Sequence, residues 1–250
     1  MSLAVAMVAL PRVGPLPALS DLNAWLAGHA QSMPPLIAAQ SSDEALAATA
    51  GDAELMIGLM TAPIPWPELE GPCASAFWWP EAAEVMKAHA AHLIVGLRAE
   101  EMVPVERNLW LTALIAAVLS TGEASGVYWG AGALVMPPEL FMEAATTMTH
   151  EVLPLDLWID FRVSREEDGS ISLFTTGLED LGHMDLEISR SSVEPGTARE
   201  SAWNVAHYLL DQGPVLNDGD SIGFGPDEQI RIRHVPSMWN PAKTVIRLEL

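Results

Sequence analysis

The first hundred residues alternate between short apolar runs and segments with helical spacing. Between the runs, residues 18–31 and 79–90 repeat apolar side chains every three or four positions, which predicts amphipathic helices. Residues 43–52 could add a further strand, so the strand count stays open. The apolar runs that predict strands are 3–10, 35–40, 53–65 and 92–99. The order β-α-β-β-α-β is that of a ferredoxin-like subdomain.

The chain after residue 100 begins with a long helix and then becomes rich in strands. "PVERNLWLTALIAAVLSTG", residues 104–122, opens with proline, ends at glycine and is apolar on most faces, which predicts a central helix. The elements expected after it are a strand with a glycine-rich turn at 126–136, a helix at 137–150, a hairpin at 155–178, a strand at 183–188, a helix at 195–213, and strands at 228–235 and 243–250.

These elements predict the α+β class, with a ferredoxin-like first half. The second half is expected to form a mixed, mostly antiparallel sheet with one covering helix. We expect two subdomains, residues 1–100 and 101–250, joined by the long helix and packed as one compact unit.

The chain of 250 residues has a net charge of −21, with 12 basic and 33 acidic residues. The acidity is spread along the sequence, because residues 1–150 carry −11 and residues 151–250 carry −10. Such a surface repels phosphate backbones and anionic lipid, which argues against nucleic acid and membrane as partners. Two interpretations stay open: the charge serves solubility, or it attracts a basic protein partner.

A single cysteine, Cys73, rules out an intramolecular disulfide and fits a reducing cytoplasm. It has no histidine close in sequence, so we interpret it as a small apolar core residue and not as a nucleophile. The apolar start, residues 3–10, lacks a basic segment before it and predicts a buried strand instead of a signal peptide. No apolar run is long enough to span a bilayer.

Several strings in the last part of the chain occur together in one known family. They are "LWIDFRV", "DGSISLFTTGLEDLGHMDLEI", "NVAHYLLDQGPVLNDGDSIG" and "IRIRHVPS", in that order over residues 155–250. In this the chain resembles the bacterial family catalogued as domain of unknown function 4261. The resemblance implies a bacterial, cytoplasmic α+β protein and supplies no substrate, cofactor or catalytic residue.

The stretch "TTGLEDLGHMDLEI", residues 175–188, gathers the side chains that chemistry uses most often. On a strand starting near His183, the side chains of His183, Asp185 and Glu187 share one face. Such a face can form a site rich in oxygen and nitrogen ligands, or it can be the solvated side of a strand whose other side is buried. His207, on the helix at 195–213, is a packed residue or a partner in an acid–base site.

Other candidate motifs are incomplete. His89 and His92 have the i, i+3 spacing of a helical metal site, but His92 is expected to begin a strand. "GAGAL", residues 130–134, lacks the third glycine of a dinucleotide loop, and no G-x-S-x-G is present. We therefore expect no cofactor and no metal.

Tryptophan is abundant, with nine residues against two tyrosines. Trp78 and Trp79 are adjacent just before a helix, so both cannot easily face one core, and Trp129 follows in a strand. Exposed tryptophans anchor protein interfaces, whereas buried ones fill cores.

The leading hypothesis is a non-catalytic protein-interaction or binding module with an acidic surface, using Trp78, Trp79 and Trp129. One form of this hypothesis is an acidic antagonist that masks a basic partner. Two alternatives stay open: an enzyme that uses His183, Asp185, Glu187 and His207, and a small-ligand sensor with an apolar pocket between the halves.

Overall fold

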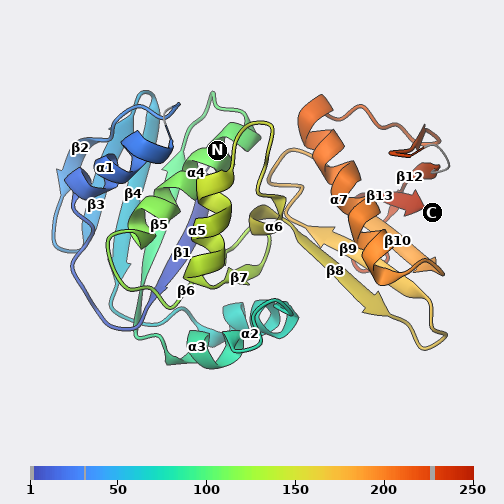
Figure 1. Ribbon diagram of the computed structural model, residues 1–250, viewed down its shortest axis with the longest axis horizontal. Helices are drawn as coiled ribbons and strands as arrows, with labels where there is room; N and C mark the ends of the chain where they lie inside the picture. The colour runs from blue at the N-terminus through green and yellow to red at the C-terminus, as the bar shows by residue number, and fades with distance from the viewer. Residues whose placement is uncertain (1–2, 31, 226–228) are drawn as a thin grey trace. The chain divides into compact units, whose positions relative to one another are not determined.

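The computed structural model describes residues 3–30, 32–225 and 229–250. The chain divides into two compact units, Met1–Trp158 and Ile159–Leu250. Both combine helices with a sheet, so the α+β class is confirmed (Figure 1). The division falls later than the expected boundary at residue 100, because two strands beyond that point join the first sheet.

The first unit is built on an antiparallel sheet. Its strand order is β2-β3-β4-β5-β1-β6-β7, and every pair of neighbours is antiparallel. The segment left open at 43–52 does form a strand, β3. The strands are β1 (Leu3–Leu10), β2 (Ile37–Ser41), β3 (Ala45–Ala50), β4 (Ala53–Met60), β5 (Ala91–Arg98), β6 (Gly126–Trp129) and β7 (Leu134–Met136).

Two helical connections cross this sheet in the same manner. β1 and β4 run parallel with β5 between them, and the chain leaves β1 through α1 (Leu19–His29). β5 and β6 run parallel with β1 between them, and α4 (Pro104–Leu119) connects them. Such split β-α-β units occur in the ferredoxin-like order. The ferredoxin-like arrangement expected for residues 1–100 is not confirmed, because β6 lies beyond that range and β2 and β3 extend the sheet past β4.

Helices cover the two faces of this sheet unequally. α1, α4 and α5 (Pro138–Thr147) pack together on one face (Figure 1). α4 is buried from Arg107 to Leu119, as expected from its apolar composition. On the other face, α2 (Trp66–Ser75) and α3 (Ala82–Ala88) cover the end of β1 together with β6 and β7. In the described part of the first unit, side chains on the rest of that second face, such as Met56 and Met60, are exposed.

The helices α2 and α3 are held by a separate apolar cluster. Trp79 and Met86 fill the space above Gly126, where an added Cβ would lie 2.7 Å from the Met86 sulfur. Cys73 belongs to this cluster, and burial raises the pKa of its thiol, which agrees with a packing role. Residues 155–158 form a short helix, α6 (Leu155–Trp158), so the expected hairpin starts later, at Asp160.

The second unit is the expected mostly antiparallel sheet with one covering helix. The strand order is β11-β12-β13-β10-β9-β8, and only β10 and β13 are parallel among the pairs in the described residues. Residue 228, the start of the strand expected at 228–235, lies outside the described residues. The elements are β8 (Asp160–Arg165), β9 (Ile171–Thr176), β10 (Leu186–Ser191), α7 (Pro195–Gln212), β11 (Ser221–Ile222), β12 (Ile230–Pro236) and β13 (Thr244–Glu249).

Candidate interaction surface

One face of the first sheet leaves apolar side chains in solvent. Along β1 and β4, alternate residues are buried under the helices, and the residues between them point to the other face. On that face Leu3 is 53% exposed, Met56 56% and Met60 44%. Contiguous exposed apolar patches of this kind mark interaction sites more often than isolated exposed residues do.

Cross-strand pairing makes these residues one continuous surface. Met56 lies opposite Gly96, and Gly96 lies opposite Val5. In the next row Gly58 lies opposite Ile94. The glycines flatten the surface, and a Cβ added at Gly58 would meet no atom within 4 Å. We call this surface the open sheet face; it comprises Leu3, Val5, Ala45, Ala47, Met56, Gly58, Met60, Ile94 and Gly96.

Acidic residues occupy both ends of the open sheet face. At the end formed by the β3–β4 turn and the chain after β5, a pocket of about 570 Å³ is lined by Asp52, Glu54, Glu100 and Glu101. Arg98 lies among them, but its guanidinium already contacts Glu54 at 3.5 Å and Glu100 at 2.8 Å. At the opposite end, the β2–β3 turn carries two further acids, Asp43 and Glu44.

The stretch 175–188 in the second unit is a clamped loop that leads into a strand. β10 begins at Leu186, so His183 and Asp185 precede it and the expected strand at 183–188 is placed too early. The Asp185 Oδ1 accepts hydrogen bonds from the Thr175 hydroxyl at 2.9 Å and from the Leu178 backbone N–H at 3.2 Å. Gly177 and Gly182 take positive φ angles of 121° and 87°, which confirms their role as turn residues.

Burial shifts the ionisation of two groups in this loop. Removal from water raises the pKa of Asp185 to about 6, against the lowering effect of its hydrogen bonds. The pKa of His183 is lowered, also by burial, and its Nδ1 has no hydrogen-bond partner in the described part of the chain. Among the described residues, Asp185 and His183 have separate surroundings, and no hydrogen bond joins their side chains.

Glu187 and His207 have structural contacts on opposite faces of the second sheet. Glu187 is buried and accepts hydrogen bonds from the Met238 backbone N–H at 3.2 Å and from Arg247 Nη2 at 3.0 Å. His207 stacks on Trp203 along α7, which covers the face that carries Phe161. Glu187 lies in register with Phe174 on the other face. The four residues therefore do not converge, and the described residues contain no group of three or more His, Cys, Asp or Glu able to hold a metal.

Residues 174–249 match the family model described as "Domain of unknown function (DUF4261)". This segment of the second unit is similar to the DUF4261 domain. The match covers β10 to β13 and α7, which is most of the segment in which the resemblance was recognised. No curated protein and no solved structure matched the chain. The description of the DUF4261 family names no activity.

The tryptophans expected at an interface lie mainly in the core of the first unit. Trp79 and Trp129 are buried, and Trp78 is half-buried with its indole N–H donating to the Val135 carbonyl at 3.2 Å. The exposed aromatic residue of this segment is Phe77, whose ring packs edge-on against Trp78. None of the three tryptophans is a large exposed side chain that could anchor a partner. The open sheet face is therefore the stronger candidate for an interaction surface.

His89 and His92 hold a loop and do not form a metal pair. His89 Nε2 accepts the Ile64 backbone N–H at 2.6 Å, and its Nδ1 donates to the Met86 carbonyl. His92 Nδ1 donates to the Ala62 carbonyl at 2.8 Å. Both rings thus fix the chain that follows β4, and burial lowers the pKa of His89.

Sequence reasoning missed the open sheet face, although a signal was present. "AELMIGLM", residues 53–60, is apolar at nearly every position, a pattern that predicts burial on both sides of a strand. The structure buries only one side. The signal was the strand that is apolar at nearly every position: when a sheet has a covering layer on one face only, such a strand indicates a surface that another molecule can cover.

Proposed function

We propose that the protein is a non-catalytic binding module whose open sheet face docks an amphipathic helix of a basic protein. The observation that carries the proposal is the exposure of Leu3, Met56 and Met60 on a continuous apolar sheet surface. A sheet is stable when each apolar face is buried against another layer. Helices supply that layer on one face, and a partner helix would supply it on the other.

The charge of the first unit supports a basic partner. Residues 1–158 contain 17 acidic and four basic residues, and one of the basic residues, Arg107, is buried. Acids lie at both ends of the open sheet face, so a helix whose apolar side is flanked by lysine or arginine matches it in pattern. The same charge disfavours nucleic acid and anionic lipid. No helix in the described residues is long and apolar enough to cross a membrane.

The absence of an assembled reactive cluster in the described residues 175–188 also favours binding over catalysis. Asp185 and Glu187 accept hydrogen bonds from backbone N–H groups, and Glu187 also accepts one from Arg247. We further propose a cytoplasmic location, since the single cysteine is buried as a free thiol, which suits a reducing compartment.

A defined peptide tests the proposal. A short helical peptide made only of leucine and lysine, with leucines along one side, is titrated by fluorescence anisotropy against the full chain. Met56→Glu places a charge on the open sheet face, and we expect it to weaken binding at least about tenfold, or roughly 1.4 kcal/mol. Met238→Glu, on an exposed methionine of the second unit, adds the same charge elsewhere and is expected to leave binding unchanged.

The two variants separate docking from simple charge attraction. Each adds one negative charge, so non-specific attraction of the lysines would rise equally in both. Equal binding by the two variants would overturn the proposal. A matching peptide of leucine and glutamate is expected not to bind, and its binding would overturn the assignment of a basic partner.

A further inference from the structure

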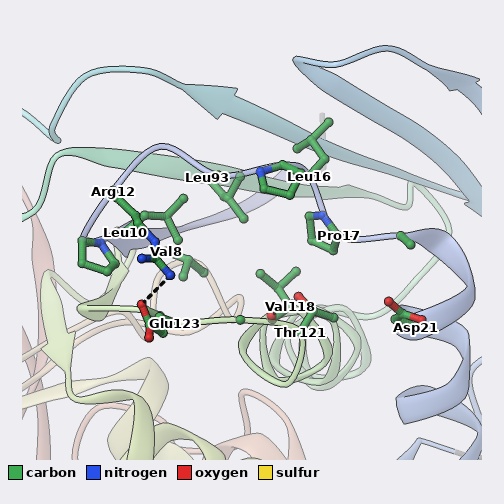
Figure 2. A pocket seen from close by; sticks show the side chains of 16 residues that line it. Val8, Leu10, Arg12, Leu16, Pro17, Asp21, Leu93, Val118, Thr121 and Glu123 are labelled. Carbon is green, nitrogen blue, oxygen red and sulfur yellow. Dashed lines mark hydrogen bonds and ion pairs between the residues drawn. The ribbon is translucent and has the colours of Figure 1, made fainter.

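A second cavity lies on the helix-covered side of the first sheet, away from the open sheet face. The pocket of about 390 Å³ lies between the segment from β1 to α1 and the end of α4 and is open to solvent on one side (Figure 2). Its volume lies within the range of pockets that hold small molecules. The two proposals are independent, because this pocket uses Val8 and Leu93, which face the helices.

The walls of this pocket are fixed before any ligand arrives. Pro11, Pro15 and Pro17 restrict the backbone of the segment that leaves β1. On the other wall, the Thr121 hydroxyl donates to the Val118 carbonyl at 2.7 Å, and this bond tightens the end of α4. A preformed wall lowers the entropy lost when a ligand binds.

Apolar side chains and prolines form part of the pocket lining. Val8, Leu93 and Val118 lie beneath it and are buried, so the apolar surface open to a ligand comes from the half-buried Leu10, Leu16 and Pro17. The prolines of the wall have no N–H to donate. An alkyl chain on a ligand would find its contacts on these apolar side chains.

The rim sets the charge of the ligand. Arg12 and Glu123 form an ion pair at 3.1 Å on one side of the pocket and neutralise each other (Figure 2). Asp21 lies on the other side, and its carboxylate accepts a hydrogen bond only from the adjacent Ser20 hydroxyl, at 3.3 Å, among the contacts within the described residues. Asp21, in the first turn of α1, is thus the rim charge for which the described residues supply no ion pair, and the net charge of −21 attracts cations.

We infer that this pocket binds a small apolar amine, with the hydrocarbon on Leu10, Leu16 and Pro17 and the ammonium group at Asp21. The cavity, its fixed walls and the charge left at its rim lead to this ligand class together. A carboxylate ligand of the same size would meet Asp21 and Glu123 and be repelled.

Hexylammonium is the probe, measured by saturation-transfer NMR and titration on the full chain. We expect saturable binding of hexylammonium, and none of hexanoate. Asp21→Asn keeps the side-chain size and is expected to weaken binding about threefold, the effect of one exposed ion pair. Leu16→Trp fills the pocket and is expected to abolish binding, with the melting curve of the variant showing that it is folded.

Asp43→Asn is the matched control, since it removes one acid outside the pocket and is expected to change nothing. Hexylammonium that fails to saturate, that still binds the Leu16→Trp variant, or that binds Asp21→Asn as well as the unaltered chain would each overturn the inference. Equal binding of hexanoate would overturn the assignment of a cationic group.

Discussion

Asp185 is a carboxylic acid that the fold holds largely away from water. Its pKa is raised by burial to about 6, from an ordinary value of 3.8. Below pH 3.8 the folded and unfolded chains are both protonated at this residue. Between the two values the unfolded chain loses the proton and the folded chain keeps it, so the free energy of unfolding falls as the pH rises. Above about pH 6 this cost is constant.

Replacing Asp185 by asparagine is expected to remove this pH dependence. The amide oxygen can still accept the hydrogen bonds of Thr175 and Leu178, and no charge has to be buried. Relative to the unaltered chain, Asp185→Asn should gain up to about 3 kcal/mol between pH 4 and pH 7.5, measured by urea unfolding. Asp211→Asn, on an exposed residue at the end of α7, is the control and should gain nothing. A gain of the same size in the control would contradict the assignment.

Glu187 shows the opposite use of a buried carboxylate. It connects β10 to the backbone at Met238 and to Arg247, so its removal leaves both partners without an acceptor. We expect Glu187→Ala to lower the free energy of unfolding by about 3 kcal/mol. Glu249→Ala, at the exposed end of β13, should change it by less than about 0.5 kcal/mol. Chemical denaturation of both variants decides between a structural Glu187 and a dispensable one.

The sequence predicted one shared role for Asp185 and Glu187, on a common strand face, whereas the structure gives each acid its own partners. Alternation of polar and apolar residues predicts one solvated face from His183 to Glu187. Asp185 instead turns back to the Thr175 hydroxyl, and Glu187 reaches a backbone N–H 51 positions away. Periodicity in one segment contains no information about such distant partners, which is why burial of these acids could not be predicted.

At the scale of elements, strongly periodic segments were predicted well and mixed segments were not. α4 and α7 were expected at 104–122 and 195–213 and are found at Pro104–Leu119 and Pro195–Gln212. α2 was missed, because Gly71 and Pro72 within it lower its helix propensity. Packing of Leu69 and Cys73 into the cluster with Trp79 stabilises it despite that sequence.

The loop between β4 and α2 depends on a neutral histidine. His89 accepts the Ile64 N–H, and protonation of the ring would remove this acceptor. Burial lowers the pKa of His89 below its ordinary 6.5, with His92 as a neighbouring charge that lowers it further. As the pH falls through 6.5 the unfolded chain gains a proton that the folded chain resists, so stability is lost on the acid side.

His89→Ala is expected to weaken this loop and to remove its response to acid. At pH 8 the variant should lose about 1–3 kcal/mol, the cost of leaving a buried N–H without a partner. Below pH 6.5 its difference from the unaltered chain should shrink. His29→Ala, on an exposed ring of α1, serves as the control in the same denaturation series. A constant difference at all pH values would mean that His89 does not titrate with folding.

For the whole molecule, the pairing of strands that are far apart in the sequence could not be predicted. The addition of β6 and β7 to one edge of β1 moves the division of the chain to residue 158. The open sheet face depends on a second set of long-range pairings, the order β3-β4-β5-β1. Composition, in contrast, carries over directly, because a net charge of −21 acts on the molecule whatever its topology.

This charge gives salt two opposite effects. Repulsion among 33 acidic residues destabilises the compact state, and salt screens it. At 500 mM NaCl the Debye length is well below the roughly 10 Å that it has at about 0.1 M, so the repulsion is largely screened. Raising NaCl from 10 mM to 500 mM should therefore raise the unfolding temperature, by roughly 2–4 °C for each kcal/mol gained in the free energy of unfolding. The same change should weaken docking of the leucine–lysine peptide, since that encounter relies on attraction between opposite charges. A fall in unfolding temperature would mean that surface pairs such as Arg98 with Glu100 outweigh the repulsion. Docking that salt leaves untouched would mean that the apolar surface binds without help from its acidic ends.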